Sequence, residues 1–599
     1  MTLLERLRND AVFLAGALRA LRHASPIAKN PTRVFPVLMA ELAARYGDKP
    51  ALISEAETLT YCGLAERANR YSRWAFAQGL RKGDTVCLLM PNRPEYVAIW
   101  LGIIQAGGAV ALLNTNLVGP SLARCIDLVA PTHVIVADTL ASALASAARH
   151  LKSAPQVWSH GGGAVSARRI DRTVAALSGE PLSAVQRPTL TIEDHALFIY
   201  TSGTTGMPKA ANVNHYRLML AALGFAGVMA TRASDRMYDC LPMYHTTGGV
   251  VAIGALLVKG GSVVIRDKFS ASAFWDDIAR HECTIFQYVG ELCRYLVNAP
   301  PHPAEARHRL RLACGNGLRP DVWPAFAKRF RIPRIIEFYA ATEGNVTLFN
   351  FEGRPGAIGR LPRLLERRFP VRIVRFDVTR EAPLRDARGF CIRCAADEVG
   401  EAIGRIVNDP AAPSGRFEGY ADRAESEAKI LRDVFEPGDA WFRTGDLMRQ
   451  DRHGYFYFVD RIGDTFRWKG ENVSTGEVAE ILNRCPGIRD ANVYGVAVAA
   501  HEGRAGMAAI VAGPDLDLAG LRAHVHALLP DYARPLFVRL RDELEVTMTF
   551  KQKKTELVAQ GFDPAQCADA IYFDDPRAAA YVRIDHALYE EIIGGAIRI

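Results

Sequence analysis

The chain has 599 residues, more than a single hydrophobic core normally serves, so it is expected to fold into two or more domains. Its 73 basic and 65 acidic residues leave a net charge of +8, which excludes the dense basic footprint of a nucleic-acid-binding protein and agrees with anionic substrates or an anionic membrane surface. The eleven cysteines are scattered along the chain, which favours reduced thiols in the cytoplasm.

The first 34 residues are predicted to form an amphipathic extension. Between Leu3 and Arg22, leucines and arginines recur at helical spacing, with acidic Glu5 and Asp10 among them and no small-residue cleavage site, which disfavours a signal peptide. Such a helix either lies on a membrane surface or docks on the body of the protein, and the pattern alone does not separate the two. No uninterrupted apolar run of about eighteen residues occurs, so no membrane-spanning helix is predicted.

From Phe35 to about Leu190, apolar runs alternate with helical patterns. The runs Asp84–Met90 and His133–Ala137 have the character of strands, whereas Pro94–Leu101 has that of a helix. This alternation predicts an α/β domain with a parallel, doubly wound sheet.

A short loop after residue 200 suits the binding of a polyphosphate. The apolar run Ala196–Tyr200 predicts a strand that enters the loop, glycines allow backbone N–H groups to turn inward, and short hydroxyls add donors. Pro208 restricts the exit, and Lys209 adds a mobile positive charge. The residues predicted to contact phosphate are Tyr200, Thr201, Ser202, Gly203, Thr204, Thr205, Gly206 and Lys209. The spacing is not that of a Walker A loop.

The stretch Tyr200–Lys209 resembles the phosphate loop of the acyl-adenylate-forming (AMP-binding) enzymes, which include acyl-CoA synthetases, luciferases and non-ribosomal adenylation domains. The stretch Phe466–Thr475 resembles more narrowly the branch of fatty acid transport proteins and very-long-chain acyl-CoA synthetases, and Glu337–Asn345 agrees with it. The resemblance covers nearly all of the chain from Phe35. It implies an ATP- and acyl-binding domain of stacked α/β subdomains at residues 35–460 and a small mobile α+β domain at residues 461–599.

The resemblance also assigns roles along the large domain. His245, which follows an apolar strand at a turn bounded by proline and glycine, is implied to lie beside the acyl carboxylate. The segment Thr284–Glu291 resembles the lining of the acyl pocket, although core packing explains its apolar residues equally well. The turn formed by Gly315, Asn316 and Gly317 is similar to the loop at the adenine edge.

The second strong motif is Glu337–Asn345. Here the resemblance implies that Tyr339 stacks on the purine, that Ala341 and Thr342 contact the nucleotide, and that Glu343 holds Mg²⁺ between phosphates. Ala340 stands where the family commonly has glycine, and one methyl group there crowds the nucleotide loop slightly.

The remaining assignments lie near and within the small domain. The resemblance gives Asp446 and Arg461 to the ribose, Lys469 and Gly470 to CoA, and Lys551 to the developing charge at the α-phosphate, with Thr205 as a further catalytic residue. Lys553 and Lys554 compete with Lys551, because Phe550 replaces the glycine that precedes the catalytic lysine in other branches. Gly463 stands where many relatives have a charged hinge residue.

A basic stretch from Arg360 to Arg375 has two interpretations: a solvated strand face, or a contact with CoA phosphates or anionic lipid. Cys391 and Cys394 form the sole CxxC of the sequence, which has no second pair to complete a zinc site and is interpreted as structural.

The resemblance implies an acid–thiol ligase that uses ATP, Mg²⁺ and CoA to convert a long or very long fatty acid into acyl-CoA, AMP and pyrophosphate. Two alternatives stay open: an acyl-AMP ligase that delivers to a separate carrier protein, and a membrane-associated fatty acid uptake factor. A non-catalytic lipid-binding relative is disfavoured by the presence of Lys209, Glu343, Asp446, Arg461 and Lys551. The expected location is cytoplasmic or peripheral on an anionic membrane, with a dimer as one option for the oligomeric state, and a sterol acid is an open alternative substrate.

Overall fold

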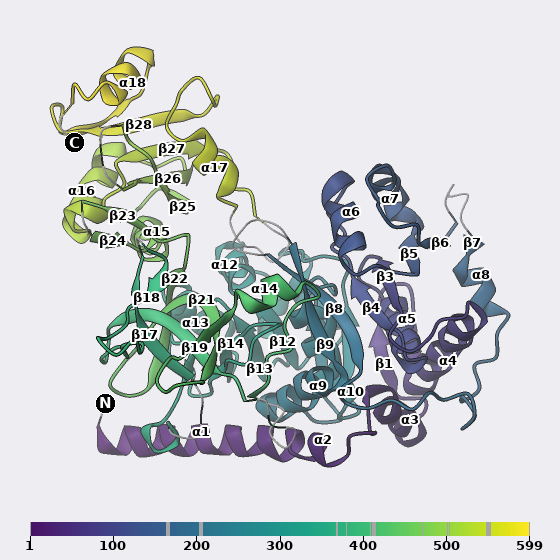
Figure 1. The fold of residues 1–599 in the computed structure, drawn as a ribbon. Helices are drawn as coiled ribbons and strands as arrows, with labels where there is room; N and C mark the ends of the chain where they lie inside the picture. Colours follow the sequence, from purple (N-terminus) through teal and green to yellow (C-terminus); the bar gives the residue numbers. More distant parts are fainter. Residues whose placement is uncertain are drawn as a thin grey trace. The chain divides into compact units, whose positions relative to one another are not determined.

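The computed structural model describes residues 2–162, 168–202, 208–366, 369, 371–378, 380–407, 409, 415–469, 471–499, 501, 503–546, 553–597 and 599. These residues fall into two compact units. Unit 1 comprises Met1–Pro370, Gly404–Arg432 and Gly438–Phe442, and unit 2 comprises Val371–Ile403, Asp433–Pro437 and Arg443–Ile599 (Figure 1). These units are not the predicted domains, and the domain boundary expected at residue 461 stays a prediction.

One sheet of unit 1 leads into the predicted phosphate loop. In spatial order its strands are β7 (Arg168–Arg169), β6 (Gln156–His160), β5 (His133–Ala137), β3 (Thr85–Leu89), β4 (Ala109–Leu112), β8 (His195–Ser202) and β9 (Pro208–Asn214). Neighbouring strands are parallel except β8 and β9, which are antiparallel. Strands β3, β4 and β5 are buried along their whole length, as expected of parallel strands covered on both faces. The predicted parallel α/β organisation is confirmed.

The second sheet of unit 1 carries the later motifs. Its spatial order is β15 (Thr347–Asn350), β14 (Ile335–Ala340), β13 (Leu312–Asn316), β12 (Ile285–Val289), β10 (Arg236–Asp239), β11 (Ser262–Ile265), β1 (Pro50–Ile53) and β2 (Thr58–Thr60). The pairs at the two edges are antiparallel and those between them are parallel. Because the parallel strands share one direction, the segments that follow β12, β13 and β14 emerge at the same edge of the sheet.

Helices of unit 1 cover these sheets (Figure 1). They are α1 (Leu3–Ala24), α2 (Pro26–Lys29), α3 (Phe35–Tyr46), α4 (Tyr61–Ala77), α5 (Pro94–Gln105), α6 (Gly119–Leu128), α7 (Ala141–Ala148), α8 (Ile170–Ala175), α9 (His215–Met229), α10 (Ile253–Leu257), α11 (Phe274–Arg280), α12 (Gly290–Asn298), α13 (Val322–Phe330) and α14 (Arg423–Glu427). The main core links α3, α4, α5, α9 and α10 with strands of both sheets. Helix α5 extends the predicted helix at Pro94–Leu101 by one turn.

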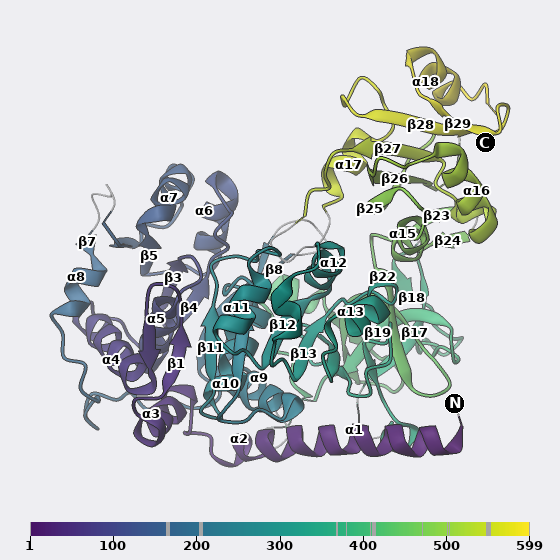
Figure 2. The ribbon, with the colours of Figure 1, turned by 180° about the vertical axis from the view of Figure 1, so that it is seen from behind.

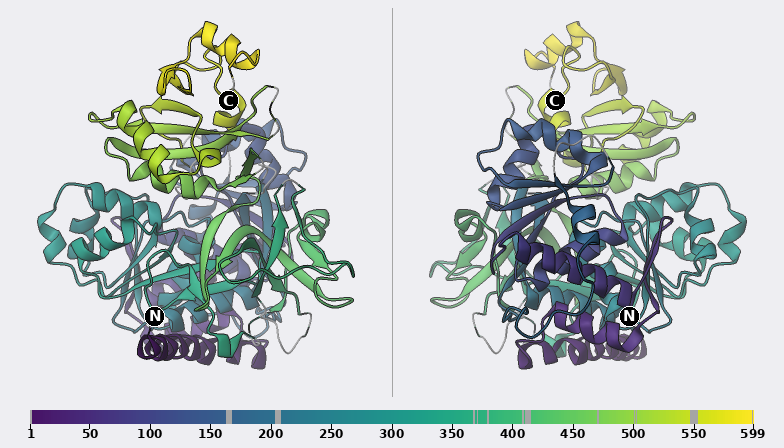
Figure 3. Two further views of the ribbon diagram at one scale, coloured as in Figure 1. Left: turned by 90° about the vertical axis from the view of Figure 1, so that its left-hand side faces the viewer. Right: turned by 90° about the vertical axis from the view of Figure 1, so that its right-hand side faces the viewer.

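Helix α1 is the predicted N-terminal helix, and it docks on unit 1. It begins with a capping box, in which the Glu5 N–H donates to the Thr2 hydroxyl and the Thr2 N–H donates to the Glu5 carboxylate at 2.7 Å. In Figures 1 and 2 it runs along one edge of unit 1 with α9 beside it, and Figure 3 looks along it. Across the described part of the chain, no helix combines the length and apolar character that crossing a membrane requires.

Unit 2 contains a twisted sheet and an α+β body. In the first, β22 (Tyr455–Arg461), β21 (Ala440–Gln450), β19 (Val399–Arg405), β17 (Val371–Asp377) and β18 (Ala382–Pro383) are neighbours in this order, although the ends of β19 and β21 belong to unit 1. The body has the strand order β25 (Ile488–Val496), β26 (Ala505–Ala512), β27 (Phe537–Arg541), β28 (Ala570–Asp575) and β29 (Ala580–Arg583). Its helices are α15 (Thr475–Asn483), α16 (Leu518–Leu528), α17 (Thr555–Gln560) and α18 (His586–Ile593). The predicted α+β C-terminal fold is confirmed.

Candidate functional site

The predicted phosphate loop joins two paired strands. In the antiparallel register, Thr201 of β8 lies opposite Lys209 of β9, so the predicted strand before the loop is confirmed. The predicted contacts Gly203, Thr204, Thr205 and Gly206 lie outside the described residues, and Ser202 is described in its backbone alone. Tyr200 is buried, and its hydroxyl donates to the Cys125 carbonyl at 2.5 Å, so this side chain supports the strand rather than extending into the loop.

Lys209 is held more firmly than its sequence context predicts. It lies within β9 at 7% exposure, forms an ion pair with Glu425 of α14, and has its Nζ 5.7 Å from the centre of the Tyr420 ring. The sequence predicts a mobile positive charge at the loop exit, which Pro208 restricts. Pairing of β9 with β8 instead fixes the lysine backbone, so only its side chain is free to exchange partners.

Tyr420 connects the phosphate strand to the second motif. Its hydroxyl donates to Glu343 Oε1 at 2.7 Å, and Thr201 is a further hydrogen-bond partner of the same hydroxyl. Burial raises the pKa of Tyr420, so the hydroxyl remains a donor at neutral pH. The structure therefore brings Thr201 and Glu343 together through a tyrosine that the sequence analysis did not single out.

The turn around His245 depends on close backbone contacts. A Cβ atom at Gly249 would lie 1.8 Å from the Met243 carbonyl oxygen, so the turn requires glycine at this position. His245 is half-buried, with its ring centre 4.5 Å from that of Tyr244. Directly after it, Thr246 hydrogen-bonds Thr342 with 2.8 Å between the hydroxyl oxygens. The turn thus brings the predicted His245 segment beside the predicted Thr342 segment.

The predicted adenine-edge loop is held by Glu337, a buried carboxyl group on β14. Its carboxyl accepts hydrogen bonds from the N–H groups of Gly317 and Leu318 and from the Tyr288 hydroxyl. Burial raises the pKa of Glu337 to about 8, with these three donors acting in the opposite direction. Gly317 has a φ of +79°, which only glycine adopts without strain. Sequence analysis quoted Glu337 merely as the start of a motif and missed this role.

Arg217 supports the second motif in the same way. From α9 its guanidinium donates to the carbonyl oxygens of Thr342 at 2.6 Å and Gly344 at 2.7 Å, with a longer contact of 3.4 Å to Ala341. Loss of solvent lowers the pKa of Arg217 from its ordinary value. In the sequence, Arg217 is the single arginine of a long, mostly apolar helix, and this signal could have identified it as a site residue.

A cavity of about 320 Å³ in unit 1 begins at these motifs. The hydroxyl-bearing residues Thr246, Thr247, Thr342 and Thr347 line it together with Ala340 and Ala341. The rest of its wall is mostly apolar and comes from α1, α9, the π-helical turn η2 (Thr247–Ala252), β14 and β15. A largely apolar pocket with a few converging polar groups is the usual form of a small-molecule site.

Two predicted site segments, Tyr339 and Thr284–Glu291, do not line this cavity. Asn316, from the predicted adenine-edge turn, does line it. Tyr339 is half-buried at the end of β14, and Phe286 and Tyr288 of β12 are fully buried. Core packing therefore accounts for the apolar residues of β12, and the role of Tyr339 stays a prediction.

The predicted ribose pair lies on two adjacent strands of unit 2. Asp446 of β21 is directly opposite Arg461 of β22, and Asp446 Oδ1 lies 3.9 Å from Arg461 Nε. The sequence predicts a carboxylate after a strand and a glycine turn, but β21 continues through Gly445 to Gln450. The positive φ of Gly445, +78°, bends the strand without ending it, because cross-strand pairing resumes beyond it.

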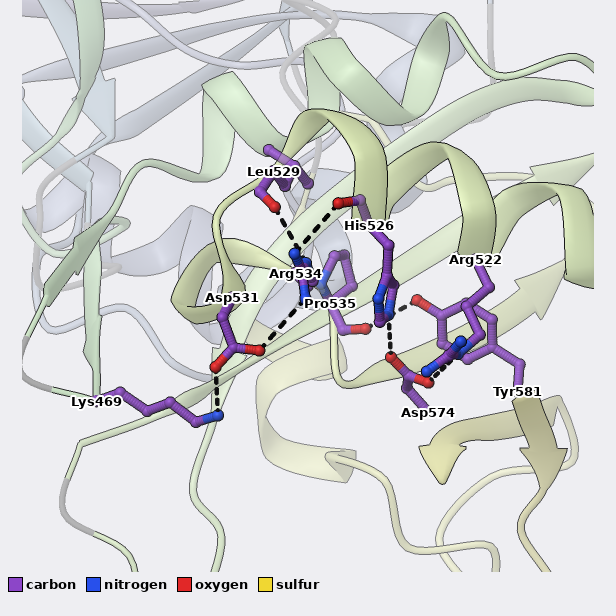
Figure 4. Close-up of polar contacts among 9 residues, drawn as sticks. All are labelled: Lys469, Arg522, His526, Leu529, Asp531, Arg534, Pro535, Asp574 and Tyr581. Atoms are coloured by element: carbon purple, nitrogen blue, oxygen red, sulfur yellow. Dashed lines mark hydrogen bonds and ion pairs between the residues drawn. The ribbon is translucent and has the colours of Figure 1, made fainter. Parts of the chain in front are cut away.

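Lys469 lies at the tip of the hairpin formed by β23 (Phe466–Trp468) and β24 (Glu471–Val473). Its ammonium pairs with Asp531 at 2.8 Å, and Asp531 in turn lies 3.5 Å from Arg534 (Figure 4). The predicted CoA contact Gly470 lies outside the described residues. The hairpin thus presents its predicted lysine beside a second cation, with one carboxylate between them.

The three candidate lysines near residue 551 are not equivalent. Lys553 pairs with Glu545 at 3.2 Å, and Lys554 donates to the Thr475 hydroxyl at 2.8 Å and lies 3.5 Å from Asp464. Both competitors are therefore engaged within unit 2. Lys551 falls in the part of the chain that is not described, and its role stays a prediction.

The arginine-rich stretch does not act as one surface. Arg360 is almost fully buried, with Nη2 2.5 Å from Asp10 of α1 and Nη1 3.1 Å from Glu352. Arg375 pairs with Glu398 at 2.7 Å within unit 2. The stretch therefore supplies structural ion pairs at both positions, which neither of the two sequence interpretations included.

Comparisons with known proteins agree with this geometry. Residues 39–369 match the family of AMP-binding enzymes, and residues 477–551 match the AMP-binding enzyme C-terminal domain. The long-chain fatty acid transport protein 1 of Mus musculus is 41% identical over 571 residues, which cover 94% of this chain and 88% of that protein. The long-chain fatty acid transport protein 2 of Rattus norvegicus is 38% identical over 600 residues, covering 99% and 96%. A crystal structure of an anthranilate CoA ligase with anthranoyl-AMP has a TM-score of 0.75 at 21% identity over 89% of this chain and 98% of that one, a likeness of fold.

Proposed function

Because the chain belongs to the AMP-binding enzyme family, with long-chain fatty acid transport proteins among its relatives, we propose that it is an ATP-dependent fatty acyl-CoA synthetase for long or very long chains. The family and branch predicted from the sequence are confirmed by these matches. The fold is that of an adenylate-forming enzyme.

The observation that carries the proposal is the cavity of about 320 Å³. Thr246 and Thr342 line it, Glu343 is next to Thr342 in the sequence, and most of the other lining side chains are apolar. A fatty acid has the same division, a charged head and a long apolar tail. Burying each methylene group contributes about 0.8 kcal/mol, so a tail of about sixteen carbons gains on the order of 12 kcal/mol before entropic costs.

The residues present also fit ATP and Mg²⁺. Glu343 is a half-buried carboxylate oriented by Tyr420, with the Thr342 hydroxyl next to it in sequence. Mg²⁺ is usually held by one or two carboxylates together with substrate phosphates and water, so this donor set is sufficient without a preformed cage. Mg²⁺ bound there would neutralise charge on the phosphates. Asp446 and Arg461 are proposed for the ribose.

The chain's own residues would then act by positioning and charge. The turn at His245 holds the acid's carboxylate near Thr342, where it attacks the α-phosphorus of ATP and displaces pyrophosphate. Lys209 exchanges Glu425 for the leaving pyrophosphate, and Lys551 is proposed to meet the charge that develops at the α-phosphate. The CoA thiolate, presented near Lys469 and Gly470, then takes the acyl group and releases AMP. Residues 461–599 are proposed to move between the two steps.

The test is pyrophosphate release from ATP and Mg²⁺ across a panel of fatty acids, with and without CoA. Release that needs a long acid, with acyl-CoA formed whenever CoA is added, is the expected result. Pyrophosphate without acylation of CoA would favour an acyl-AMP ligase that serves a carrier protein. If no acid supported release, the proposal would fail, and the methyl group of Ala340 would be the first position to restore to glycine.

A second proposal concerns the outer face of α1, which we propose contacts an anionic membrane and so couples fatty acid uptake to activation. Leu3, Leu4, Leu7 and Leu18 are 56–79% exposed there, at helical spacing. Arg6, Arg8 and Arg22 are exposed on the same helix, against a single exposed acidic residue, Glu5. An apolar row bordered by arginines suits a lipid surface with negative head groups.

Sedimentation with vesicles tests this contact. Vesicles of phosphatidylcholine with phosphatidylglycerol should bind the protein, and the double variant L7Q/L18Q should bind roughly 100-fold more weakly, because two leucines no longer enter the lipid. The matched control is V185Q, since Val185 is 97% exposed and lies elsewhere on unit 1. Equal binding by both variants would count against the contact.

A further inference from the structure

Helix α1 forms part of the wall of the cavity. From the inner face of the helix, Phe13, Ala17, Ala20 and Ala24 line the cavity, together with the partly exposed Leu21 beside them. The first four positions recur at intervals of four, three and four residues, so they form one continuous strip along the helix. The strip is unusual in its small side chains, because three of its four members are alanine.

The distance between α1 and the cavity is set by direct backbone contact. A Cβ atom at Gly227 of α9 would lie 2.6 Å from the Cα of Ala20, so the two helices meet with no side chain between them. A Cβ atom at Gly16 would lie 2.6 Å from ring carbons of Phe351. The buried ion pair between Asp10 and Arg360 adds a third attachment. A helix fixed at three places is a rigid wall rather than a loose cover.

This wall lies outside the segment that matches the family. The AMP-binding match begins at residue 39, whereas α1 ends at Ala24. The segments of Thr246 and Thr342 therefore lie within the AMP-binding match, whereas the part of the wall that α1 forms lies before it. Resting on the proposed fatty acyl-CoA synthetase function, we propose that the inner strip of α1 determines the maximum length of the acyl chain.

Phe13 is the bulkiest member of the strip. Its ring makes edge contacts with Phe351 and Phe369, with centres 5.7 and 6.5 Å apart, and both of these rings also line the cavity. Ala17 is one turn further along the same strip and leaves open the volume that a larger side chain would occupy. Replacing the alanine should therefore shorten the pocket, and replacing the phenylalanine should lengthen it.

The test compares A17F and F13A with wild type. The first measurement is displacement of bound cis-parinaric acid by saturated acids of about 6 to about 20 carbons, which needs neither ATP nor CoA. Each methylene that A17F excludes should weaken binding about fourfold, so the longest acids lose about 60-fold when three methylenes are excluded, while the shortest are unchanged. F13A should shift the preference toward longer acids. The control A15F has the same substitution on the exposed face of α1 and should behave as wild type.

Two results would overturn the inference: a wild-type protein that takes up no parinaric acid, or A17F and F13A profiles that coincide with that of A15F. Because F13A acts in the opposite direction, a folding defect of A17F does not decide the outcome. The same panel is then repeated as pyrophosphate release. A length shift in binding with no pyrophosphate release from any acid would leave the wall established and refute the synthetase proposal.

Discussion

Substitution of Arg217 by lysine should separate support of the nucleotide loop from general stability. The guanidinium donates to two carbonyls of the loop at 2.6 and 2.7 Å and approaches a third at 3.4 Å. A lysine ammonium carries one charge on one nitrogen and cannot reproduce the planar fork that spans these oxygens. At least one short bond is therefore lost at this half-buried position.

The expected magnitude follows from that count. A hydrogen bond to a charged group contributes about 1.5–3 kcal/mol, so R217K should lose about 2–3 kcal/mol of stability. The loop that carries Thr342 and Glu343 should also shift, and a misplacement of about 1 Å can reduce a rate about 100-fold. We expect ATP–pyrophosphate exchange in the presence of a long acid to fall between about 10-fold and about 100-fold in R217K.

The matched control is R329K. Arg329 of α13 also donates to three carbonyls, those of Val297, Ala299 and Pro300, at 2.7, 2.7 and 3.0 Å, and it does not line the cavity. Its replacement should lower the thermal midpoint by a similar amount without changing exchange by the folded protein. Equal exchange rates for R217K and R329K would refute the argument that Arg217 positions the loop.

Three further predictions follow from single contacts. E425Q removes the ion-pair partner of Lys209, so the KM for ATP should fall about 2- to 10-fold with kcat unchanged. A raised KM in steady-state kinetics would contradict the idea that Glu425 competes with the phosphates of ATP for Lys209. Y420F removes the donor to Glu343, so half-saturation by Mg²⁺ in the exchange assay should rise roughly 10-fold, and an unchanged Mg²⁺ dependence would show that the carboxylate needs no such support. Because burial raises the folded pKa of Glu337 to about 8, above its unfolded value, its stabilising contribution is complete below about pH 4.5 and is lost as pH rises to about 8. The thermal midpoint of wild type should therefore fall more steeply than that of E337Q between pH 6 and pH 8.5, and parallel slopes would exclude this titration.

Much of the fold could be predicted because its signals are local. Continuous apolar runs marked the parallel strands β3 and β5, and they are buried along their whole length. The strand before the phosphate loop, the helix at Pro94 and the amphipathic N-terminal helix follow from periodicity over a few residues. Motif resemblance then located the segments of the site.

The contacts that assemble the site were not predictable in the same way, because they join residues far apart in sequence. Arg217 and Thr342 are separated by 125 positions, and no pattern within α9 indicates which carbonyl groups its arginine meets. Lys209 and Glu425 are likewise brought together only by the fold. A hydrogen bond is decided by a distance of a few tenths of an ångström, which periodicity does not encode.

Helix α1 shows, within one element, what local sequence signals determine and what long-range contacts determine. The sequence by itself predicted a helix between Leu3 and Arg22 with leucines and arginines on its surface, because helical periodicity is a local property. It did not determine which of two apolar faces packs inward, since the alanine strip and the leucine row are both apolar. Tertiary structure decided this: α1 approaches Gly227 closely at Ala20 and Phe351 closely at Gly16, so Ala17, Ala20 and Ala24 face the cavity, whereas Leu3, Leu4, Leu7 and Leu18 face outward.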